Sequence, residues 1–276
     1  MTLVRSALVT SVTIMMAALI AIFAFLQSVP GGALGPYLLN PHITEQEIGP
    51  LKHGYDEPQF LQFADWLRRI ASIDFGWSQS DSEPVSQALL DRLPASLQLM
   101  AVALVLAAAL FAIKLIVAPA DAGKVPRAAF AALGLLGRAV PVFVLALIVQ
   151  FLALQFRFPT AGIASRDDFD WHDRFVHLEL PAIALAVPLA AWVTRHVEDG
   201  KVPAPSAIVA LLLSAMVLVE TIFAWPGVGR LIFNAINQRD IPLVQAAVIV
   251  LAVVFVLLNL LVDVLYARLD PRVRLA

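Results

Sequence analysis

Six apolar stretches constrain this chain more than any other feature of its sequence. They fall at about residues 8–29, 95–117, 139–156, 178–193, 207–224 and 244–266. A helix needs about 17–25 apolar residues to cross the hydrocarbon of a bilayer. The fourth stretch is short and contains Pro181 and Pro188, so it is predicted to pack inside a bundle that satisfies its freed carbonyls. The sequence therefore predicts an all-α membrane protein with six transmembrane helices.

Composition supports a multi-pass membrane protein. Hydrophobic residues make up 60% of the chain and charged residues 14%, and the mean hydropathy is +0.83. A soluble domain of this size would expose too much apolar surface. The net charge of -2 favours no nucleic-acid partner, and the absence of cysteine excludes disulfides and thiolate metal sites. No cofactor is expected.

Basic residues predict that both termini are cytoplasmic (N-in/C-in), because short loops rich in Lys and Arg stay inside. The inner set is Arg5, Lys114, Lys124, Arg127, Arg138, Arg195, Lys201, Arg268, Arg272 and Arg274. The predicted organisation is an N-terminal transmembrane helix (1–30), an external segment (31–93) and a core domain with five transmembrane helices (94–276). Apolar residues at helical spacing over 59–70 predict an amphipathic helix in the external segment. A short interfacial helix is expected over 128–136.

The region between the last two spans predicts a re-entrant external hairpin. An apolar helix stops at Trp225, turns through Pro226-Gly227-Val228-Gly229 and continues as an amphipathic helix before the last span. Such backbone is tolerated only when it is buried in protein or lines a wet cavity. The residues predicted to shape a pathway or gate are Glu220, Thr221, Trp225, Pro226, Gly227, Gly229, Arg230, Arg239 and Asp240.

Individual polar residues leave alternatives open. Glu220 is either interfacial or structural, or it lines the pathway. We expect Gly227→Val to impair function, because a β-branched residue disfavours a turn. Asn259 and Asp263 are four residues apart and are expected to make hydrogen bonds between helices. The acidic loop with Asp168 either binds a divalent cation or is a solvated loop that keeps the external face acidic.

Catalytic chemistry is not predicted. The sequence has no Gly-x-x-x-x-Gly-Lys-Ser/Thr phosphate loop and no His-Glu-x-x-His zinc motif. No constellation of acid, base and nucleophile falls at membrane depth, so an enzyme is not expected.

Several motifs resemble the permeases of the dipeptide/oligopeptide/nickel family of ABC importers. They are Ser28-Val29-Pro30-Gly31, Phe75-Gly76-Trp77-Ser78, Arg92 to Leu99, Pro141-Val142-Phe143, Leu180-Pro181-Ala182, Val219 to Arg230, Asn259 to Tyr266 and Asp270 to Arg274. The resemblance implies a subunit that forms half of a translocation pathway for peptides or similar small polar solutes. It also implies three partners: a second permease, cytoplasmic ATPase subunits and an external binding protein. The alternative is a coupling-deficient subunit that serves as a scaffold or inactive half of a heterodimer.

One inner loop departs from that family. In the resembling permeases, a long loop between the fourth and fifth spans contains a short helix that docks on the ATPase. Here the connection is short and contains Arg195, Glu198, Asp199, Gly200 and Lys201, followed by two prolines. Glycine and proline predict a tight turn with little room for a helix. We therefore expect the ATPase to be coupled mainly through the partner permease.

Overall fold

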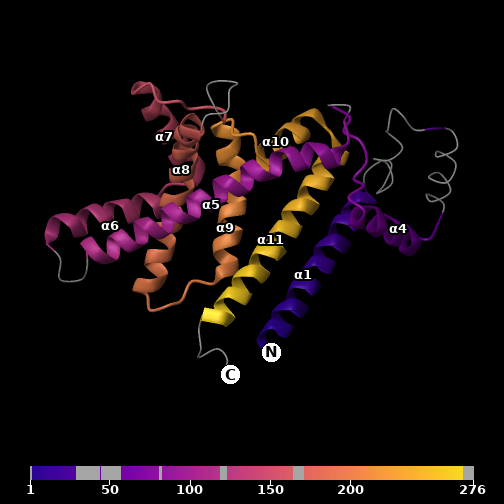
Figure 1. Ribbon diagram of the computed structural model, residues 1–276, viewed down its shortest axis with the longest axis horizontal. Helices are drawn as coiled ribbons and strands as arrows, with labels where there is room; N and C mark the ends of the chain where they lie inside the picture. Colours follow the sequence, from indigo (N-terminus) through magenta and orange to yellow (C-terminus); the bar gives the residue numbers. More distant parts are fainter. Residues whose placement is uncertain are drawn as a thin grey trace. The chain divides into compact units, whose positions relative to one another are not determined.

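The computed structural model describes residues 2–28, 44, 57–80, 83–118, 123–163 and 171–269. In this part of the chain the secondary structure is helical, with one isolated β-bridge between Trp77 and Pro84. The helices are α1 (Thr2–Leu26), α4 (Gln59–Ala71), α5 (Val85–Val117), α6 (Lys124–Ala139), α7 (Val142–Gln155), α8 (Trp171–Glu198), α9 (Pro205–Ile222), α10 (Val228–Gln238) and α11 (Ile241–Leu269) (Figure 1). Five of these helices are long and apolar enough to cross a membrane. The prediction of an all-α membrane protein is thus confirmed.

The third predicted span differs from the continuous helix expected over residues 139–156. α6 and α7 are separated by Val140 and Pro141 and are bent by 119°. α7 has 14 residues, which at 1.5 Å per residue is about 21 Å long, less than the hydrocarbon thickness of about 30 Å. The total is therefore five spans, or six if this bent pair counts as one. The proline fixes the break, because it has no N–H to continue the helical ladder.

The second span also begins earlier than predicted. The boundary expected between Leu93 and Pro94 falls inside α5, which starts at Val85 and contains Pro94. The residues before the proline are already helical, and their apolar face is buried at Val85, Ala88 and Leu89. A proline that could have marked the first helical turn is therefore an interior residue of this helix.

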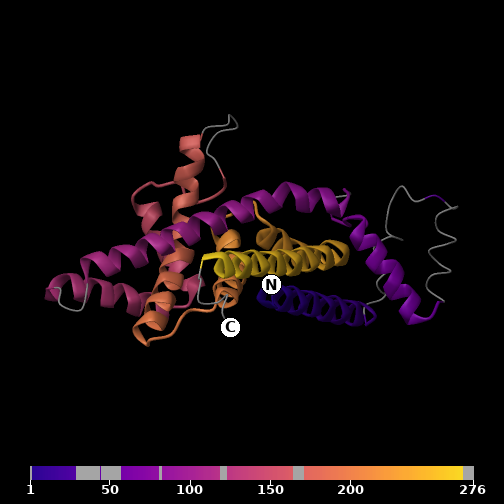
Figure 2. The same ribbon diagram turned by 60° about the horizontal axis from the view of Figure 1, so that its bottom comes forward.

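The chain divides into two compact units, one of residues 1–91 with 231–276 and the other of residues 92–230. In the first unit, α1 and α11 lie side by side, and the N-terminal end of α1 lies near the C-terminal end of α11 (Figures 1 and 2). α4 packs at the other end of α1. There Trp66 is fully buried, and its ring centroid lies 5.5 Å from that of Phe23. α4 is the amphipathic helix predicted over residues 59–70.

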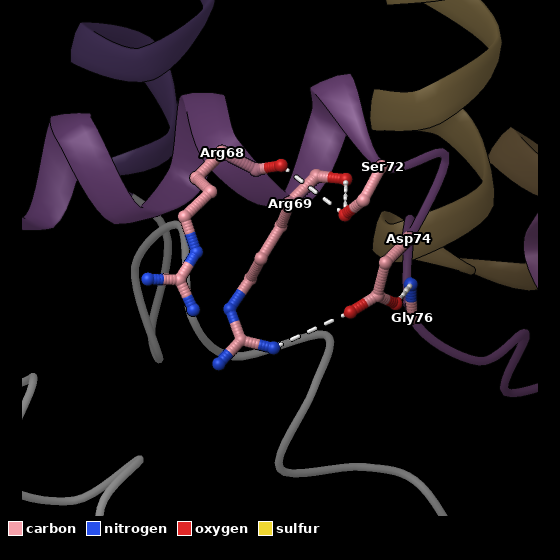
Figure 3. Close-up of polar contacts among 5 residues, drawn as sticks. All are labelled: Arg68, Arg69, Ser72, Asp74 and Gly76. Carbon is pink, nitrogen blue, oxygen red and sulfur yellow. Dashed lines mark hydrogen bonds and ion pairs between the residues drawn. The ribbon is translucent and has the colours of Figure 1, made fainter.

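Polar contacts define how α4 ends (Figure 3). The Ser72 hydroxyl donates to the backbone oxygens of Arg68 and Arg69, at 3.1 and 2.9 Å. Arg69 forms an ion pair with Asp74, with 3.3 Å between Nη1 and Oδ2. The other carboxylate oxygen of Asp74 accepts from the backbone N–H of Gly76 at 3.2 Å. These contacts set the direction of the segment that continues to Ser78.

In the second unit, α8 is the central helix and contacts α6, α7 and α9. Its small residues allow close approach, as in many membrane helix pairs. At Gly137 of α6, an added Cβ would lie 2.7 Å from the Cβ of Ala191 and 2.9 Å from the backbone oxygen of Val187. More than half of the apolar part of α8 is buried. This agrees with the expectation that the span with Pro181 and Pro188 packs inside a bundle.

Candidate functional site: the hairpin around Glu220

The hairpin begins where α9 closes. Ala224 has a positive φ of 51°, and the backbone N–H of Trp225 donates to the Glu220 oxygen at 2.8 Å. This pattern is a Schellman motif, which satisfies carbonyls at a helix end. The left-handed position is usually taken by glycine. Because alanine stands there instead, the sequence does not predict this turn. The result is a sharp reversal directly after Phe223.

The Glu220 side chain then caps the next helix. Glu220 is fully buried. Its carboxylate accepts from the Ser96 hydroxyl at 2.6 Å, and from the backbone N–H groups of Arg230, at 3.1 Å, and Gly229. The Ser96 oxygen in turn accepts from the backbone N–H of Val228 at 2.8 Å. Ser96 and Glu220 together satisfy three of the four N–H groups that the start of α10 leaves without helical partners. A negative charge is also favourable at this end of the helix dipole.

Gly227 and Gly229 are required by close approach. A Cβ at Gly227 would fall on the Glu220 carboxylate, and a Cβ at Gly229 would lie 2.6 Å from the Cα of Val217. Neither glycine is among the residues with positive φ in the described part of the chain. The reason expected for Gly227, its conformational freedom in a turn, is therefore wrong. Glycine is needed there because Glu220 occupies the space of a side chain.

The neighbouring predicted residues support the same hairpin. Trp225 is fully buried, and its indole N–H donates to the backbone oxygen of Ala95 at 2.9 Å. The guanidinium of Arg230 donates to the backbone oxygen of Ala224. The Thr221 hydroxyl bonds to Val217 of its own helix, at 2.7 Å. Pro226 is half-buried between Trp225 and Gly227.

This geometry bears on the two interpretations of Glu220. Both carboxylate oxygens are occupied by hydrogen bonds, and the side chain has no exposed area in the chain. A carboxylate held in this way has no free oxygen with which to bind a solute or relay a proton. The arrangement favours a structural role over lining the pathway. Among the described residues, no group of three or more His, Asp or Glu side chains could hold a metal ion, and Asp168 lies outside that part of the chain.

Arg239 and Asp240 belong to the other unit and join α10 to α11. Arg239 is exposed and has a positive φ of 59°, and the N–H of Asp240 donates to the Ala235 oxygen at 2.8 Å. Asp240 then caps α11, because its Oδ1 accepts from the backbone N–H of Leu243 at 3.1 Å. Aspartate is one of the preferred residues for this position. Two adjacent residues thus close one helix and start the next.

The second oxygen of Asp240 binds the segment that precedes α5. Oδ2 accepts from the Ser78 hydroxyl at 2.6 Å, from the Ser80 hydroxyl at 2.9 Å and from the Ser80 N–H at 3.1 Å. Asp240 is fully buried, so these bonds offset the cost of removing its charge from water. The sequence did not predict the roles of Ser78, Ser80 and Ser96. Ser78 and Ser96 do lie in two of the motifs that carry the family resemblance, and their contacts explain why hydroxyls stand there.

Of the two candidates for helix packing in α11, the structure describes the side chain of Asn259 only. The side chain of Asp263 lies outside the described residues. The Oδ1 of Asn259 is buried without a hydrogen-bond partner in the part of the chain that the structure describes. The expected interhelical bond is therefore not made by this oxygen. The neighbouring helix α1 presents mainly apolar side chains and offers few donors.

The connection between α8 and α9 is a turn that contains no helix. Gly200 has a positive φ of 73°, and the N–H of Lys201 donates to the His196 oxygen at 2.8 Å, which closes α8 in a Schellman motif. Arg195 pairs with Asp199 at 3.0 Å, and Glu198 pairs with Lys114 at 2.8 Å. The chain is then irregular until α9 starts at Pro205.

Comparison with known proteins identifies the class. Residues 204–275 match the family described as "binding-protein-dependent transport system inner membrane component". A probable peptide ABC transporter permease of Sinorhizobium fredii is 30% identical over 97% of both chains. An oligopeptide transport system permease of Bacillus subtilis is 28% identical over 95% of this chain and 96% of the relative. A dipeptide transport system permease of Alkalihalophilus pseudofirmus is 28% identical over 92% and 94%.

These similarities define a membrane component of a binding-protein-dependent transport system. The chain belongs to the family of peptide permeases of ABC importers. It is a multi-pass subunit of the cell membrane.

Ser96→Ala tests the hairpin. The change leaves a buried Glu220 oxygen and the Val228 N–H without their partner, so we expect the unfolding free energy to fall by about 1–3 kcal/mol. Ser214→Ala is the matched control, because Ser214 is exposed and bonds only to Ala210 of its own helix. Its effect should stay within about 0.5 kcal/mol. Unfolding of both variants is measured in one detergent, and equal shifts would contradict the proposed role of Ser96.

Asp240→Asn tests the second buried carboxylate. An amide has one oxygen in place of two, so it cannot accept from Leu243 and from both serines. We expect a loss of about 1–3 kcal/mol and faster protease cleavage within residues 72–84. Asp65→Asn is the control in the same unit, because Asp65 is an exposed residue of α4 outside that segment, and its effect should stay within about 0.5 kcal/mol. Unchanged cleavage in Asp240→Asn would argue that Asp240 does not hold the segment that precedes α5.

Proposed function

We propose that this permease subunit forms half of a translocation pathway for peptides or similar small polar solutes, together with a second permease. The observation that carries the proposal is similarity to peptide permeases over nearly the full length of both chains. An external binding protein delivers the solute, and cytoplasmic ATPase subunits drive transport. This division of labour fits a sequence without a phosphate-binding loop of its own.

In this proposal, both termini are cytoplasmic and the hairpin around Glu220 lies on the external side. The distribution of Lys and Arg supports this orientation. The fold agrees with both termini being on one side of the membrane, because the start of α1 and the end of α11 lie at the same end of that helix pair (Figure 1). The hairpin then acts as a rigid wall near the external mouth of the pathway. Its buried carboxylate gives it a fixed shape rather than a solute-binding group.

Uptake assays test the proposed function. The tagged chain, the permease that co-purifies with it, the ATPase subunits and the binding protein are reconstituted in liposomes with labelled dipeptides and oligopeptides. We expect ATP-dependent accumulation only when every component is present. Gly227→Val should abolish uptake at normal membrane levels, because the side chain would displace Glu220. Full uptake without this chain would contradict the proposal.

We further infer that the ATPase is coupled mainly through the partner permease. The turn from Asp199 to Ala204 contains no helix that could dock on an ATPase. One finding supports a local departure from the family. The family match begins only at Ala204, at the end of this turn.

Crosslinking tests the coupling route. A cysteine is introduced at Lys201, which is exposed in the turn, in a chain that has no cysteine of its own. We expect its crosslinking to the ATPase to be at least about tenfold weaker than that from the corresponding loop of the partner, a difference of about 1.4 kcal/mol if the yields reflect equilibrium contact. A cysteine at Arg157, on the side predicted to be external, is the negative control. Efficient, nucleotide-sensitive crosslinking from Lys201 would overturn the inference.

A further inference from the structure

A basic cavity lies where three helices of the second unit meet, away from the hairpin. It has a volume of about 600 Å³ and lies between the end of α5, one face of α6 and the last turns of α8. Its charged lining residues are Lys114, Arg127, Arg138, Arg195 and Glu198. Four cations thus face a single carboxylate. Such an excess of positive charge around a cavity favours a compact anionic ligand.

The bonds within the cavity leave capacity for such a ligand. Lys114 pairs with Glu198 at 2.8 Å, and Arg195 pairs with Asp199 at 3.0 Å. The Nε of Arg138 donates to the backbone oxygen of Gly134 in its own helix, at 2.9 Å. The two terminal nitrogens of Arg138 have no partner among the described residues. A guanidinium presents these nitrogens as a fork that matches the oxygens of a phosphate.

The surroundings of the cavity are those of a membrane interface. Lys114 lies in the last turn of a helix whose next residues, Ile116 and Val117, are 78% and 49% exposed. α6 also exposes apolar side chains, with Val125 at 80% and Leu135 at 61%. An amphipathic helix that bends by 119° from its neighbour is suited to lie along the headgroup region. Apolar side chains beside a basic cavity provide separate places for acyl chains and for a headgroup.

A second cavity extends the apolar side of this arrangement. It has a volume of about 450 Å³, and Arg138 lines it together with apolar residues that include Val142, Leu185 and Leu211. The Arg138 side chain thus borders both a charged cavity and an apolar one. A soluble anion would not fill the apolar cavity, whereas the acyl chains of a phospholipid would.

We propose that this basic cavity binds the phosphate headgroup of an anionic phospholipid. Arg127 and Arg138 of α6, with Lys114 and Arg195, hold the phosphate, and the exposed apolar residues of α5 and α6 contact the acyl chains. Basic cavities between membrane helices commonly bind such headgroups. The predicted orientation places the cavity on the cytoplasmic leaflet. The site involves neither Glu220 nor Asp240, and only its assignment to the cytoplasmic leaflet rests on the proposed function.

Lipid retention tests the proposal. The full chain is purified in phosphatidylcholine nanodiscs, phosphatidylglycerol is titrated in, and bound lipid is counted by native mass spectrometry. A basic residue near a membrane surface contributes about fivefold in affinity. We therefore expect the double variant Arg127→Gln/Arg138→Gln to weaken phosphatidylglycerol binding about 25-fold. Lys124→Gln is the matched control, because Lys124 is an exposed residue of α6 that does not line the cavity. Its effect should not exceed the roughly fivefold contribution of one basic residue near the surface.

A gain of binding separates the proposal from simple misfolding. Glu198→Gln removes the one carboxylate of the cavity and frees Lys114, so it should strengthen phosphatidylglycerol binding several-fold. Arg127→Lys/Arg138→Lys keeps the charge but loses the guanidinium fork, so it should bind phosphatidylglycerol more weakly than the unaltered chain and more tightly than the glutamine double variant. Equal losses in the Lys124 and Arg127/Arg138 variants would overturn the proposal. The proposal would also be overturned if glycerol phosphate bound as tightly as the lipid, or if the ATPase, rather than the lipid, occupied the cavity.

Discussion

The burial of the Glu220 carboxylate is the constraint on which the hairpin depends. A charge removed from water must be matched by hydrogen bonds, and here the donors come from two places in the sequence. Ser96 lies in α5, while Gly229 and Arg230 begin α10. The same contacts fix the end of α9, since Glu220 also accepts through its backbone from Trp225. One residue therefore sets where two helices end and begin, and requires glycine at position 227.

Asp240 repeats this solution in the other unit. Its two oxygens serve different elements, one the first turn of α11 and the other the serines that precede α5. In both cases, the acid is buried, accepts from a serine hydroxyl and satisfies backbone groups that a helix end or loop leaves open. These contacts join motifs that are far apart in the sequence. They explain, without any catalytic or solute-binding role, why polar residues recur at fixed places in such an apolar chain.

Periodicity and apolar length predicted most of the fold, because each span must satisfy its own backbone in lipid. The same rules predicted α4 from Phe60, Phe63 and Leu67, and the interior position of α8 from its prolines. They did not predict that Pro94 lies inside a helix, nor that α6 and α7 bend so sharply, because proline is compatible with a helix start, a kink or a break. The sequence motifs identified the site residues but not the residues to which their side chains are hydrogen-bonded. Ser96 lies 124 residues from Glu220 and Ser78 lies 162 residues from Asp240, so nothing in the local sequence indicates that these serines bind buried acids.

The length of α7 has a consequence for the surrounding lipid. At about 21 Å, α7 leaves several ångströms of hydrocarbon unmatched on each side of an average bilayer, and α6 turns away instead of making up the difference. The bilayer beside α7 must therefore become locally thinner, at a cost of a fraction of a kcal/mol per ångström of mismatch. α7 by itself is thus better matched to a thin membrane than to a thick one, whereas α5, with 33 residues, and α11, with 29, are long enough for either. The acyl-chain length of the host membrane therefore affects how stably this subunit is embedded in it.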